Sequence, residues 1–304
     1  MVLTSKIGIT GSSGMLGKHV VNYLLSKQYQ IVGTSRTNPK IVKENFSWKK
    51  LDLSEKKFQP KFNQYFKNIN CLIHIGAYVP RRNEKKIKSN YINKVNTEAT
   101  IQLAKWSKKN NVHFIFISGS AIYSKDIKNN EKSKILSFLK NFYLNSKIIS
   151  EKRIRKLSLN QKFKYTILRP SSIYGTGMDK NKIIPKYLKL LKYNRRLTIY
   201  DYEKTLVNFI HAKDIAHAIY LCLNLKKKGI FNLGSKSCRD FYYLIKNFKK
   251  ITKSKSKIHL KKSKIPKKIK TLDVNINKSM RELNWSPKIS LKKGLKMIVD
   301  KKWI

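Results

Sequence analysis

The chain has 304 residues, 41% of them hydrophobic, and its 68 Lys and Arg residues against 16 Asp and Glu give a formal net charge of +52. This length is enough to bury a full core, and it favours one large α/β domain with a smaller cap. A charge this high raises the hypothesis of a nucleic-acid partner. However, the basic residues are mostly lysines spread along the whole chain, whereas specific phosphate and base recognition relies on arginine. We therefore expect a solvated basic surface and no specific nucleic-acid partner.

The cysteine spacing argues against the common metal and disulfide frameworks. Cys71, Cys222 and Cys238 are far apart and odd in number, without CxxC spacing, so neither a disulfide nor a zinc site is indicated and we expect no metal. No apolar run reaches the ~18 residues of a membrane span. The sequence from Met1 also leads into the first predicted strand without room for a signal peptide. We therefore expect a cytoplasmic protein without a membrane partner.

The first motif is a glycine cluster between a predicted strand and a predicted helix. Residues 6–10 form an apolar run typical of a buried strand, and apolar residues recur at helical spacing from 15 to 26. Between them, Gly11, Gly14 and Gly17 have the spacing G-x-x-G-x-x-G. Glycines here let the backbone turn sharply and let a pyrophosphate approach the N–H groups at the helix start. The segment therefore predicts a dinucleotide site, and an ordinary glycine-rich turn is the alternative.

The next predicted strand, residues 29–36, should end beside the adenine ribose of such a dinucleotide. An acidic residue at that place favours NAD, whereas an arginine accepts the 2′-phosphate of NADP. The chain has Ser35 followed by Arg36. NADP is therefore slightly favoured over NAD, and an ordinary surface cation is the alternative for Arg36.

The second motif is the pair Tyr143 and Lys147. We expect a helix over residues 141–159, which places the two side chains one turn apart on the same face. A tyrosine titrates near pH ~10 when unperturbed, and a lysine ammonium together with an oxidised nicotinamide would lower that pKa. Tyr143 could then exchange a proton with a substrate alcohol or carbonyl. Since the chain is rich in both residue types, chance is the alternative for this pair taken alone.

Taken together, the glycine turn, the Tyr–Lys pair and a series of weaker motifs resemble the extended short-chain dehydrogenase/reductase family, in its NAD(P)-dependent epimerase/dehydratase branch. The resemblance extends nearly from end to end, and the motifs occur in the family's order. The further motifs are Asp52-Leu53, Leu72 to Ala77, Asn96-Thr97, Phe116 to Tyr123, Leu168-Arg169-Pro170, Tyr174-Gly175, Phe209 to His211 with Asp214, Asn232-Leu233-Gly234, Glu282 to Pro287 and Gly294-Leu295. Of these, Phe116 to Tyr123 resembles the family's strand that carries the catalytic hydroxyl.

The resemblance implies an α/β fold, a doubly wound parallel (Rossmann) sheet with a smaller mixed α/β C-terminal substrate cap. We expect the dinucleotide-binding domain at residues 1–175 with a return segment at 205–232, and the cap at residues 176–204 and 233–304. The substrate crevice would lie between the two parts, over the carboxyl ends of the strands. The resemblance also implies a homodimer through paired helices.

Roles for individual residues follow from the same resemblance. Tyr143 would be the acid/base, and Lys147 would lower its pKa while binding the nicotinamide ribose. The residues expected to bind NAD or NADP are Gly11, Ser13, Gly14, Met15, Leu16, Gly17, Arg36, Asp52, Leu53, Ile75, Ala77, Asn96, Tyr143, Lys147 and Pro170.

The chain departs from the family pattern where a catalytic serine or threonine is expected, because Gly119 occupies that position. Ser118 and Ser120 flank it, and we expect Ser120 to bind the substrate oxygen, with Ser118 as the second candidate. For both, hydrogen bonding to backbone groups at a strand end is the structural alternative. The Asp-Glu pair of the family's 4,6-dehydratases is replaced by Ser120 and Ala121. Since neither can transfer protons as a carboxylate does, 4,6-dehydration and the related decarboxylation are disfavoured.

Two further departures concern the substrate. Many members that act on nucleotide sugars have an arginine that grips the diphosphate where this chain has Val207, and an asparagine where it has Ser172. Lysine does not replace a bidentate arginine equivalently. We still expect a nucleotide-sugar substrate and a 4-epimerisation. The alternatives are an NADPH-dependent 4-ketoreductase, which Arg36 favours, and a non-catalytic dinucleotide-binding regulatory protein, which Gly119 and Val207 favour.

Overall fold

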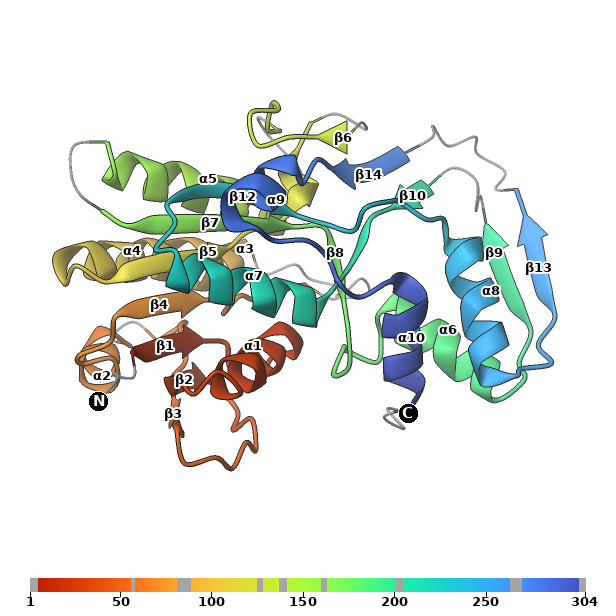
Figure 1. Ribbon diagram of the computed structural model, residues 1–304, viewed down its shortest axis with the longest axis horizontal. Helices are drawn as coiled ribbons and strands as arrows, with labels where there is room; N and C mark the ends of the chain where they lie inside the picture. Colours follow the sequence, from red (N-terminus) through yellow and green to blue (C-terminus); the bar gives the residue numbers. More distant parts are fainter. Residues whose placement is uncertain are drawn as a thin grey trace.

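Seven parallel strands form the central sheet of the protein, in the order β12-β7-β5-β4-β1-β2-β3 (Figure 1). The computed structural model describes residues 5–55, 58–80, 89–124, 128–136, 141–159, 163–200, 205–262 and 270–300. Every pairing within the sheet is parallel, as the predicted doubly wound fold requires. Its strands are β1 (Lys6–Thr10), β2 (Gln30–Ser35), β3 (Phe46–Lys50), β4 (Cys71–His74), β5 (His113–Ile117), β7 (Tyr165–Pro170) and β12 (Gly229–Leu233).

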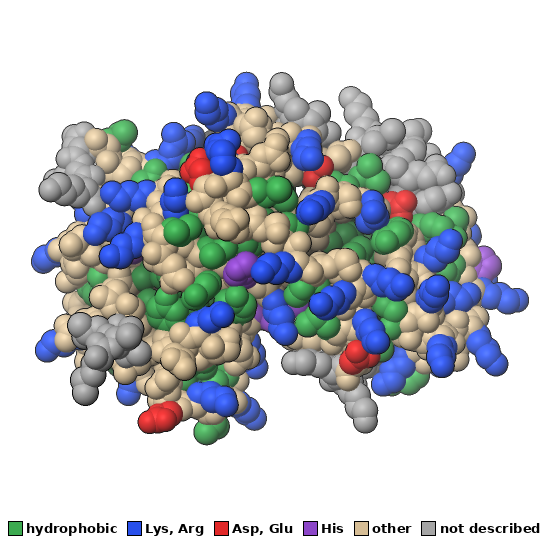
Figure 2. Space-filling view, viewed as in Figure 1, with side chains coloured by type: hydrophobic (Ala, Val, Ile, Leu, Met, Phe, Trp, Pro, Cys, Tyr) green, Lys and Arg blue, Asp and Glu red, His purple; other side chains and the backbone are tan. Residues whose placement is uncertain are grey.

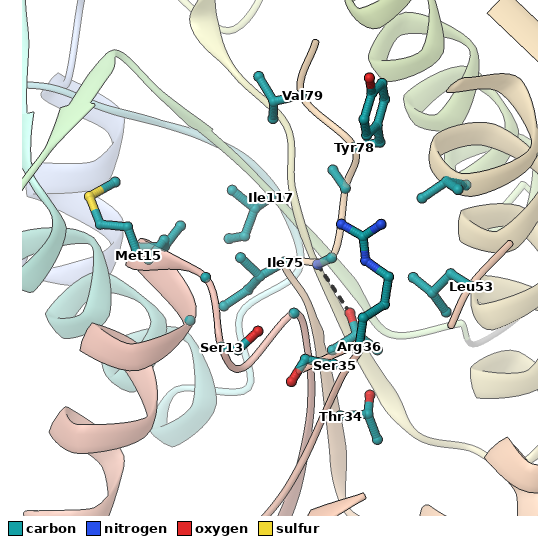
Figure 3. Close-up of a pocket in the computed structure, with 18 of the residues that line it drawn as sticks. Ser13, Met15, Thr34, Ser35, Arg36, Leu53, Ile75, Tyr78, Val79 and Ile117 are labelled. Carbon is teal, nitrogen blue, oxygen red and sulfur yellow. Dashed lines mark hydrogen bonds between the residues drawn. The ribbon is translucent and has the colours of Figure 1, made fainter. Parts of the chain in front are cut away.

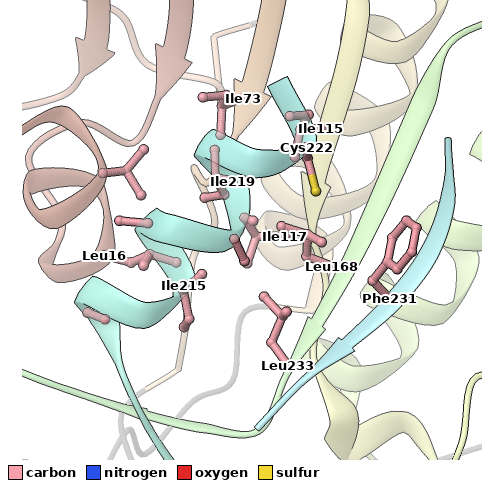
Figure 4. Packing of buried hydrophobic residues seen from close by; sticks show 14 of the residues in the cluster. Leu16, Ile73, Ile115, Ile117, Leu168, Ile215, Ile219, Cys222, Phe231 and Leu233 are labelled. Atoms are coloured by element: carbon pink, nitrogen blue, oxygen red, sulfur yellow. The ribbon is translucent and has the colours of Figure 1, made fainter. Parts of the chain in front are cut away.

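Helices cover both faces of this sheet. The helices around it are α1 (Met15–Leu25), α2 (Phe58–Tyr65), α3 (Ser89–Ile92), the π-helix η1 (Asn93–Glu98), α4 (Ala99–Lys109), α5 (Phe142–Leu157) and α7 (Ala212–Asn224). In β5, Ile115 and Ile117 belong to the core shared with α1 and α7, whereas Phe114 and Phe116 belong to the core shared with α2, α4 and α5. This alternation follows from the two-residue period of a strand. Figure 4 shows the first of these cores, with Ile215 and Ile219 of α7 against Ile117 and Leu168.

The strand order places a crevice beside β1. The chain runs outward from β1 to β2 and β3, and then returns to the other side of β1 to form β4, β5, β7 and β12. The connections that follow β1 and β4 therefore run in opposite directions from the carboxyl ends of these two neighbouring strands. In open α/β sheets, ligands bind at this point.

A third core lies beside the sheet, on the right of Figure 1. It contains apolar residues of α6, α8, α10 and β9, and it also includes Tyr174, Val207 and Phe209. Its segments come from both stretches predicted as the cap, and from the return segment as well. The exact division between domain and cap stays a prediction.

The remaining elements lie outside the central sheet and the helices that cover its faces. They are the 3₁₀ turn η2 (Ser120–Ile122), β6 (Lys128–Asn129), β8 (Ser172–Tyr174), α6 (Ile183–Lys192), β9 (Leu197–Tyr200), β10 (Thr205–Val207), β11 (Phe209–His211), α8 (Phe241–Thr252), β13 (Ile258–Lys261), β14 (Lys270–Val274), α9 (Asn277–Leu283) and α10 (Leu291–Asp300).

One predicted segment differs from the structure. The family-like stretch from Phe116 to Tyr123 reads as a strand in the sequence, but β5 ends at Ile117 and a 3₁₀ turn follows at Ser120. The backbone N–H of Ser118 still donates to the carbonyl oxygen of Leu168 on β7, at 2.9 Å. Beyond it the chain leaves the sheet, so residues 118–120 lie at its carboxyl edge. Within the described residues, no helix is both long enough and apolar enough to cross a membrane.

Candidate active site

A cavity of about 590 Å³ opens at the carboxyl edge of the sheet, where the strand order reverses. It is lined by the turn after β1, the ends of β2 and β5, the segment after β4 and one face of α5. Figure 3 shows how these segments converge, with Ser13 and Met15 on one side and Tyr78 and Leu53 on the other. The lining residues therefore come from many separate segments between residues 10 and 173.

The glycine turn brings backbone N–H groups to this cavity. Gly11 has φ +74°, a conformation that favours glycine, and its N–H donates to the carbonyl oxygen of Thr34 at 2.7 Å. A Cβ on Gly17 would lie 2.1 Å from the carbonyl oxygen of Gly11, so glycine lets α1 pack directly on the turn. No side chain caps α1, and Met15 and Leu16 of its first turn line the cavity. An uncapped helix start of this kind suits a phosphate group.

The end of β2 carries a positive charge and no carboxylate. Arg36 lines the cavity, and its Nη1 donates to the hydroxyl of Tyr91 at 3.2 Å. Figure 3 shows Arg36 extending from the end of β2 into the cavity. The hydroxyl of Ser35 is already used, because it donates to the carbonyl oxygen of Thr37 and accepts from the indole of Trp48. Arg36 is thus the residue at this end that remains available to a ligand phosphate.

Tyr143 and Lys147 line the cavity from α5, one turn apart as predicted. Lys147 is only 3% exposed, and its Nζ donates to the carbonyl oxygen of Ile117 at 2.8 Å. The ammonium also lies 4.6 Å from the centre of the Phe116 ring. Burial lowers the pKa of Lys147 to about 8, against the opposing effect of the Glu151 carboxylate. At neutral pH the ammonium therefore remains charged.

In the protein without a dinucleotide, the pKa of Tyr143 is raised. Burial raises it to about 12, because an apolar setting disfavours the phenolate. The Lys147 ammonium lies 5.8 Å from the centre of the Tyr143 ring and donates to Ile117 instead of to the phenol oxygen. The protein alone therefore keeps Tyr143 protonated, and any lowering of its pKa needs a further positive charge in the cavity.

The two candidate serines occupy different places. Ser118 lines the cavity, is 5% exposed, and its buried hydroxyl has no hydrogen-bond partner in the described structure. Ser120 begins the 3₁₀ turn and does not line the cavity. The lining therefore favours Ser118 over Ser120 as the residue that contacts a ligand, and the role of either serine stays a prediction. Gly119 is in extended backbone at φ −178°, and a Cβ there would meet only the carbonyl oxygen of Pro170, at 4.0 Å, so the backbone does not require glycine.

Most of the residues expected to bind the dinucleotide line this cavity, and two do not. Asn96 lies behind the wall, where its amide donates to and accepts from the backbone of Tyr78, at 2.8 and 2.7 Å. It orders the segment after β4 instead of contacting the cavity. Pro170 ends β7 outside the lining. The expected residues that do line the cavity are Gly11, Ser13, Gly14, Met15, Leu16, Gly17, Arg36, Asp52, Leu53, Ile75, Ala77, Tyr143 and Lys147.

Sequence reasoning gave no binding role to several lining residues, although Gly76 and Ile117 stand within motifs named above. Thr10, Thr34 and Ile117 stand at or next to the ends of parallel strands, so their position in the sheet is a signal that could have found them. Tyr78 and Tyr91 lie in segments with no such signal, and their rings contact each other edge to face, with centres 5.1 Å apart. The other missed residues are Ser35, Thr37, Leu51, Gly76, Val79, Val95 and Ile173.

The described part of the chain has no cluster of three or more His, Cys, Asp or Glu side chains that could bind a metal ion. Histidines near the cavity have other partners. His74 contacts the hydroxyl of Thr10 at 2.6 Å and that of Thr100 at 2.8 Å, and burial lowers its pKa to about 3. It is therefore a neutral structural residue beneath the glycine turn.

A parallel sheet with a glycine turn, a cavity at its switch point and a Tyr–Lys helix defines a dinucleotide-dependent enzyme of the short-chain type. The chain matches the NAD dependent epimerase/dehydratase family over residues 7–234 and belongs to that family of enzymes. It is 25% identical to a putative UDP-glucose 4-epimerase of Methanocaldococcus jannaschii over 96% of both chains. It is 23% identical to the dTDP-D-glucose 4,6-dehydratase of Bos taurus, over 97% of this chain and 88% of the relative.

The fold is also similar to that of a solved structure. UDP-glucuronic acid 4-epimerase from Bacillus cereus, in complex with NAD, matches with a TM-score of 0.83 at 21% identity. The match covers 98% of this chain and 100% of the epimerase chain. The likeness at this identity concerns the fold, and the reaction has to be argued from the residues in the cavity.

Proposed function

We propose that the protein is an NAD(P)-dependent nucleotide-sugar 4-epimerase in which Tyr143 and Lys147 form the acid–base pair. The observation that carries the proposal is that Tyr143, Lys147 and the unpartnered hydroxyl of Ser118 line the same cavity as the glycine turn and Arg36. One cavity therefore offers a phosphate site together with groups that can move a proton. Family membership and the names of the relatives support a nucleotide sugar as the substrate.

The residues present suit a nicotinamide dinucleotide. The uncapped start of α1 would bind the pyrophosphate, and the lack of a Cβ on Gly11 and Gly17 lets the backbone approach it closely. Lys147 would bind the ribose next to the nicotinamide. When bound, the dinucleotide supplies the acceptance and return of a hydride. All proton movement would fall to this chain's own side chains.

Tyr143 is the group that we assign to the proton at the sugar oxygen. Its high pKa makes it a proton donor in the protein alone, and the Lys147 ammonium lies one turn along α5, 5.8 Å from the centre of its ring. Ser118 would hydrogen-bond the same sugar oxygen, since its hydroxyl is buried and free to donate. In a 4-epimerase, oxidation at C4 gives a keto sugar that rotates in the site and is reduced on its other face. Tyr143 would start as a phenolate, which requires the positive charge of an oxidised nicotinamide to lower its pKa, and would then accept and later return one proton.

The cavity wall near these groups is apolar. Met15, Val79, Ile117 and Ile173 line it, and Figure 3 shows Met15, Val79 and Ile117 around the same space. An apolar wall excludes water and strengthens the electrostatic effect of Lys147 on its neighbours. It would also protect a keto intermediate that has to remain bound.

An NADPH-dependent 4-ketoreductase is the second candidate, and Arg36 is the observation that favours it. An arginine at the end of β2 suits a 2′-phosphate, and no carboxylate stands beside it in the cavity except Asp52, whose Oδ1 accepts from the backbone N–H of Ser54 at 2.8 Å. Dehydration is not favoured, because Ser120 and Ala121 stand where the dehydratases carry their Asp-Glu pair.

Incubation of the purified protein with a panel of UDP- and dTDP-sugars tests the proposal, with the C4 epimers resolved by NMR. We expect interconversion at C4 without net consumption of NADH or NADPH. Tyr143→Phe should slow it by about 10²- to 10⁴-fold while dinucleotide binding persists. NADPH consumption with 4-keto sugar nucleotides and no epimerisation would instead establish the reductase. Full activity of Tyr143→Phe would exclude the assigned role of Tyr143.

A further inference from the structure

The buried charges of the protein are concentrated behind the Tyr–Lys helix. Figure 2 shows Lys and Arg side chains spread over the visible face of the molecule. Among the described residues, however, only four with charged side chains are buried. Asp214 on α7 accepts from the backbone N–H groups of Lys288 and Ile289, and the other three are Lys147, Arg169 and Glu151. Burying a charge is costly unless it is paired, so an arrangement of all three in one place requires a reason.

Glu151 and Arg169 form a nearly solvent-free ion pair between α5 and β7. Their side chains are 2% and 1% exposed, respectively. Nε of Arg169 donates to Oε1 of Glu151 at 3.0 Å, and Nη2 donates to Oε2 at 2.5 Å. Nη1 donates to the hydroxyl of Tyr123 at 3.0 Å, and that hydroxyl donates to Oδ1 of Asn232 at 2.6 Å. The carboxylate is therefore held in a single position by strands on the far side of the helix.

This carboxylate stands one helical turn after Lys147, on the same face of α5. It raises the pKa of Lys147 and so opposes the burial that lowers this pKa. The guanidinium of Arg169, which binds this carboxylate, carries a positive charge and reduces the effect. The other groups that face Lys147 carry no charge. They are Tyr143 on the same helix, which is protonated, His74 on β4, which is neutral, and the carbonyl oxygen of Ile117 and the ring of Phe116 on β5.

We propose that Glu151 is a positioning residue whose carboxylate, fixed by Arg169, keeps the Lys147 ammonium charged and so sets the pH range in which the Tyr143–Lys147 pair works. The inference rests on the role proposed above for Lys147. In this arrangement α5 faces the cavity on one side, and the ion pair with Arg169 holds the helix to β7 on the other. Arg169 supplies the geometry, because a bidentate guanidinium orients both oxygens of the carboxylate.

The direct test is the titration of Lys147 itself, followed by NMR of protein labelled with ¹³C at lysine Cε. The Lys147 signal is identified by its loss in Lys147→Arg. The wild-type signal should titrate near pH 8, well below the exposed lysines. In the double variant Glu151→Gln with Arg169→Gln, which leaves no unpaired buried charge, the titration should move down by less than one unit, because the opposing guanidinium charge is removed as well.

Tyr123→Phe is the matched control. It removes the hydroxyl between Arg169 and Asn232 but keeps both charges, so it should lower thermal stability without moving the Lys147 titration. If the double variant does not fold, Glu151→Asp retracts the carboxylate while keeping its charge, and a smaller downward shift is expected. An unchanged or raised Lys147 titration in the folded variant overturns the proposal. Because no substrate is needed, a wrong reaction assignment would show separately, as a normal titration without sugar turnover.

Discussion

The carbonyl oxygen of Ile117, the last residue of β5, accepts a hydrogen bond from Nζ of Lys147 at 2.8 Å. This contact joins α5 to the carboxyl edge of the sheet. It also places the ammonium beside Ser118, which is the next residue along the chain and has a buried hydroxyl without a partner. One backbone oxygen thus anchors the Tyr–Lys helix next to the candidate substrate hydroxyl.

Ser118→Ala should reduce kcat of the proposed reaction by about 10- to 100-fold, because a hydrogen bond to a developing charge is lost. Ser120→Ala is the matched control, since Ser120 lies outside the cavity, and it should leave kcat close to the wild-type value. Steady-state kinetics with the best sugar nucleotide decides between the two serines. The reverse pattern would restore the sequence-based preference for Ser120.

Arg36→Ala should weaken NADPH binding by about 10- to 100-fold while NADH binding changes little, because only the 2′-phosphate loses its charged partner. Fluorescence titration of both dinucleotides with wild type and variant measures this. The variant should also leave the Tyr91 side chain less restrained, because in the wild type its hydroxyl accepts a hydrogen bond from Nη1 of Arg36. Wild-type protein that binds NADH more tightly than NADPH would contradict the role given to Arg36.

Gly17→Ala should destabilise the fold by about 1–3 kcal/mol, because the added Cβ would overlap the carbonyl oxygen of Gly11 at 2.1 Å. Gly14→Ala is the control, since its Cβ would meet that same oxygen at 3.4 Å, and its cost should be clearly smaller. Urea denaturation followed by circular dichroism measures both free energies of unfolding. Equal costs would mean that α1 can move away from the turn.

Burial of Lys147 should make the stability of the protein depend on pH. Its pKa falls from 10.5 in the unfolded chain to about 8 in the fold, so between these values the unfolded state binds more protons. The free energy of unfolding therefore gains a contribution that rises with pH above about 8. Lys147→Met removes this contribution. The wild-type free energy minus that of Lys147→Met should increase from pH 7.5 to pH 9, and a flat difference would show that Lys147 is not desolvated.

The sequence predicted the elements that carry the site with small errors at their ends. The strand at Lys6–Thr10 and the glycine turn were found because buried strands and glycine spacing are local signals. The helix with Tyr143 begins at Phe142 and ends at Leu157, inside the predicted range. The apparent strand through Tyr123 was wrong beyond Ile117, because Ile122 and Tyr123 favour strands by type but lie in the 3₁₀ turn and directly after it, where they are buried without belonging to the sheet.

Residue types and their spacing therefore determined the family, the parallel sheet and the Tyr–Lys pair, since each depends on neighbours within a few turns of chain. Only the tertiary structure decided that Ser118, and not Ser120, reaches the cavity, because that depends on where β5 ends against β7. It alone also joined Glu151 to Arg169, which are 18 residues apart. No local pattern encodes such a pairing, because it arises only when two buried faces meet and the charges on them have no other partner.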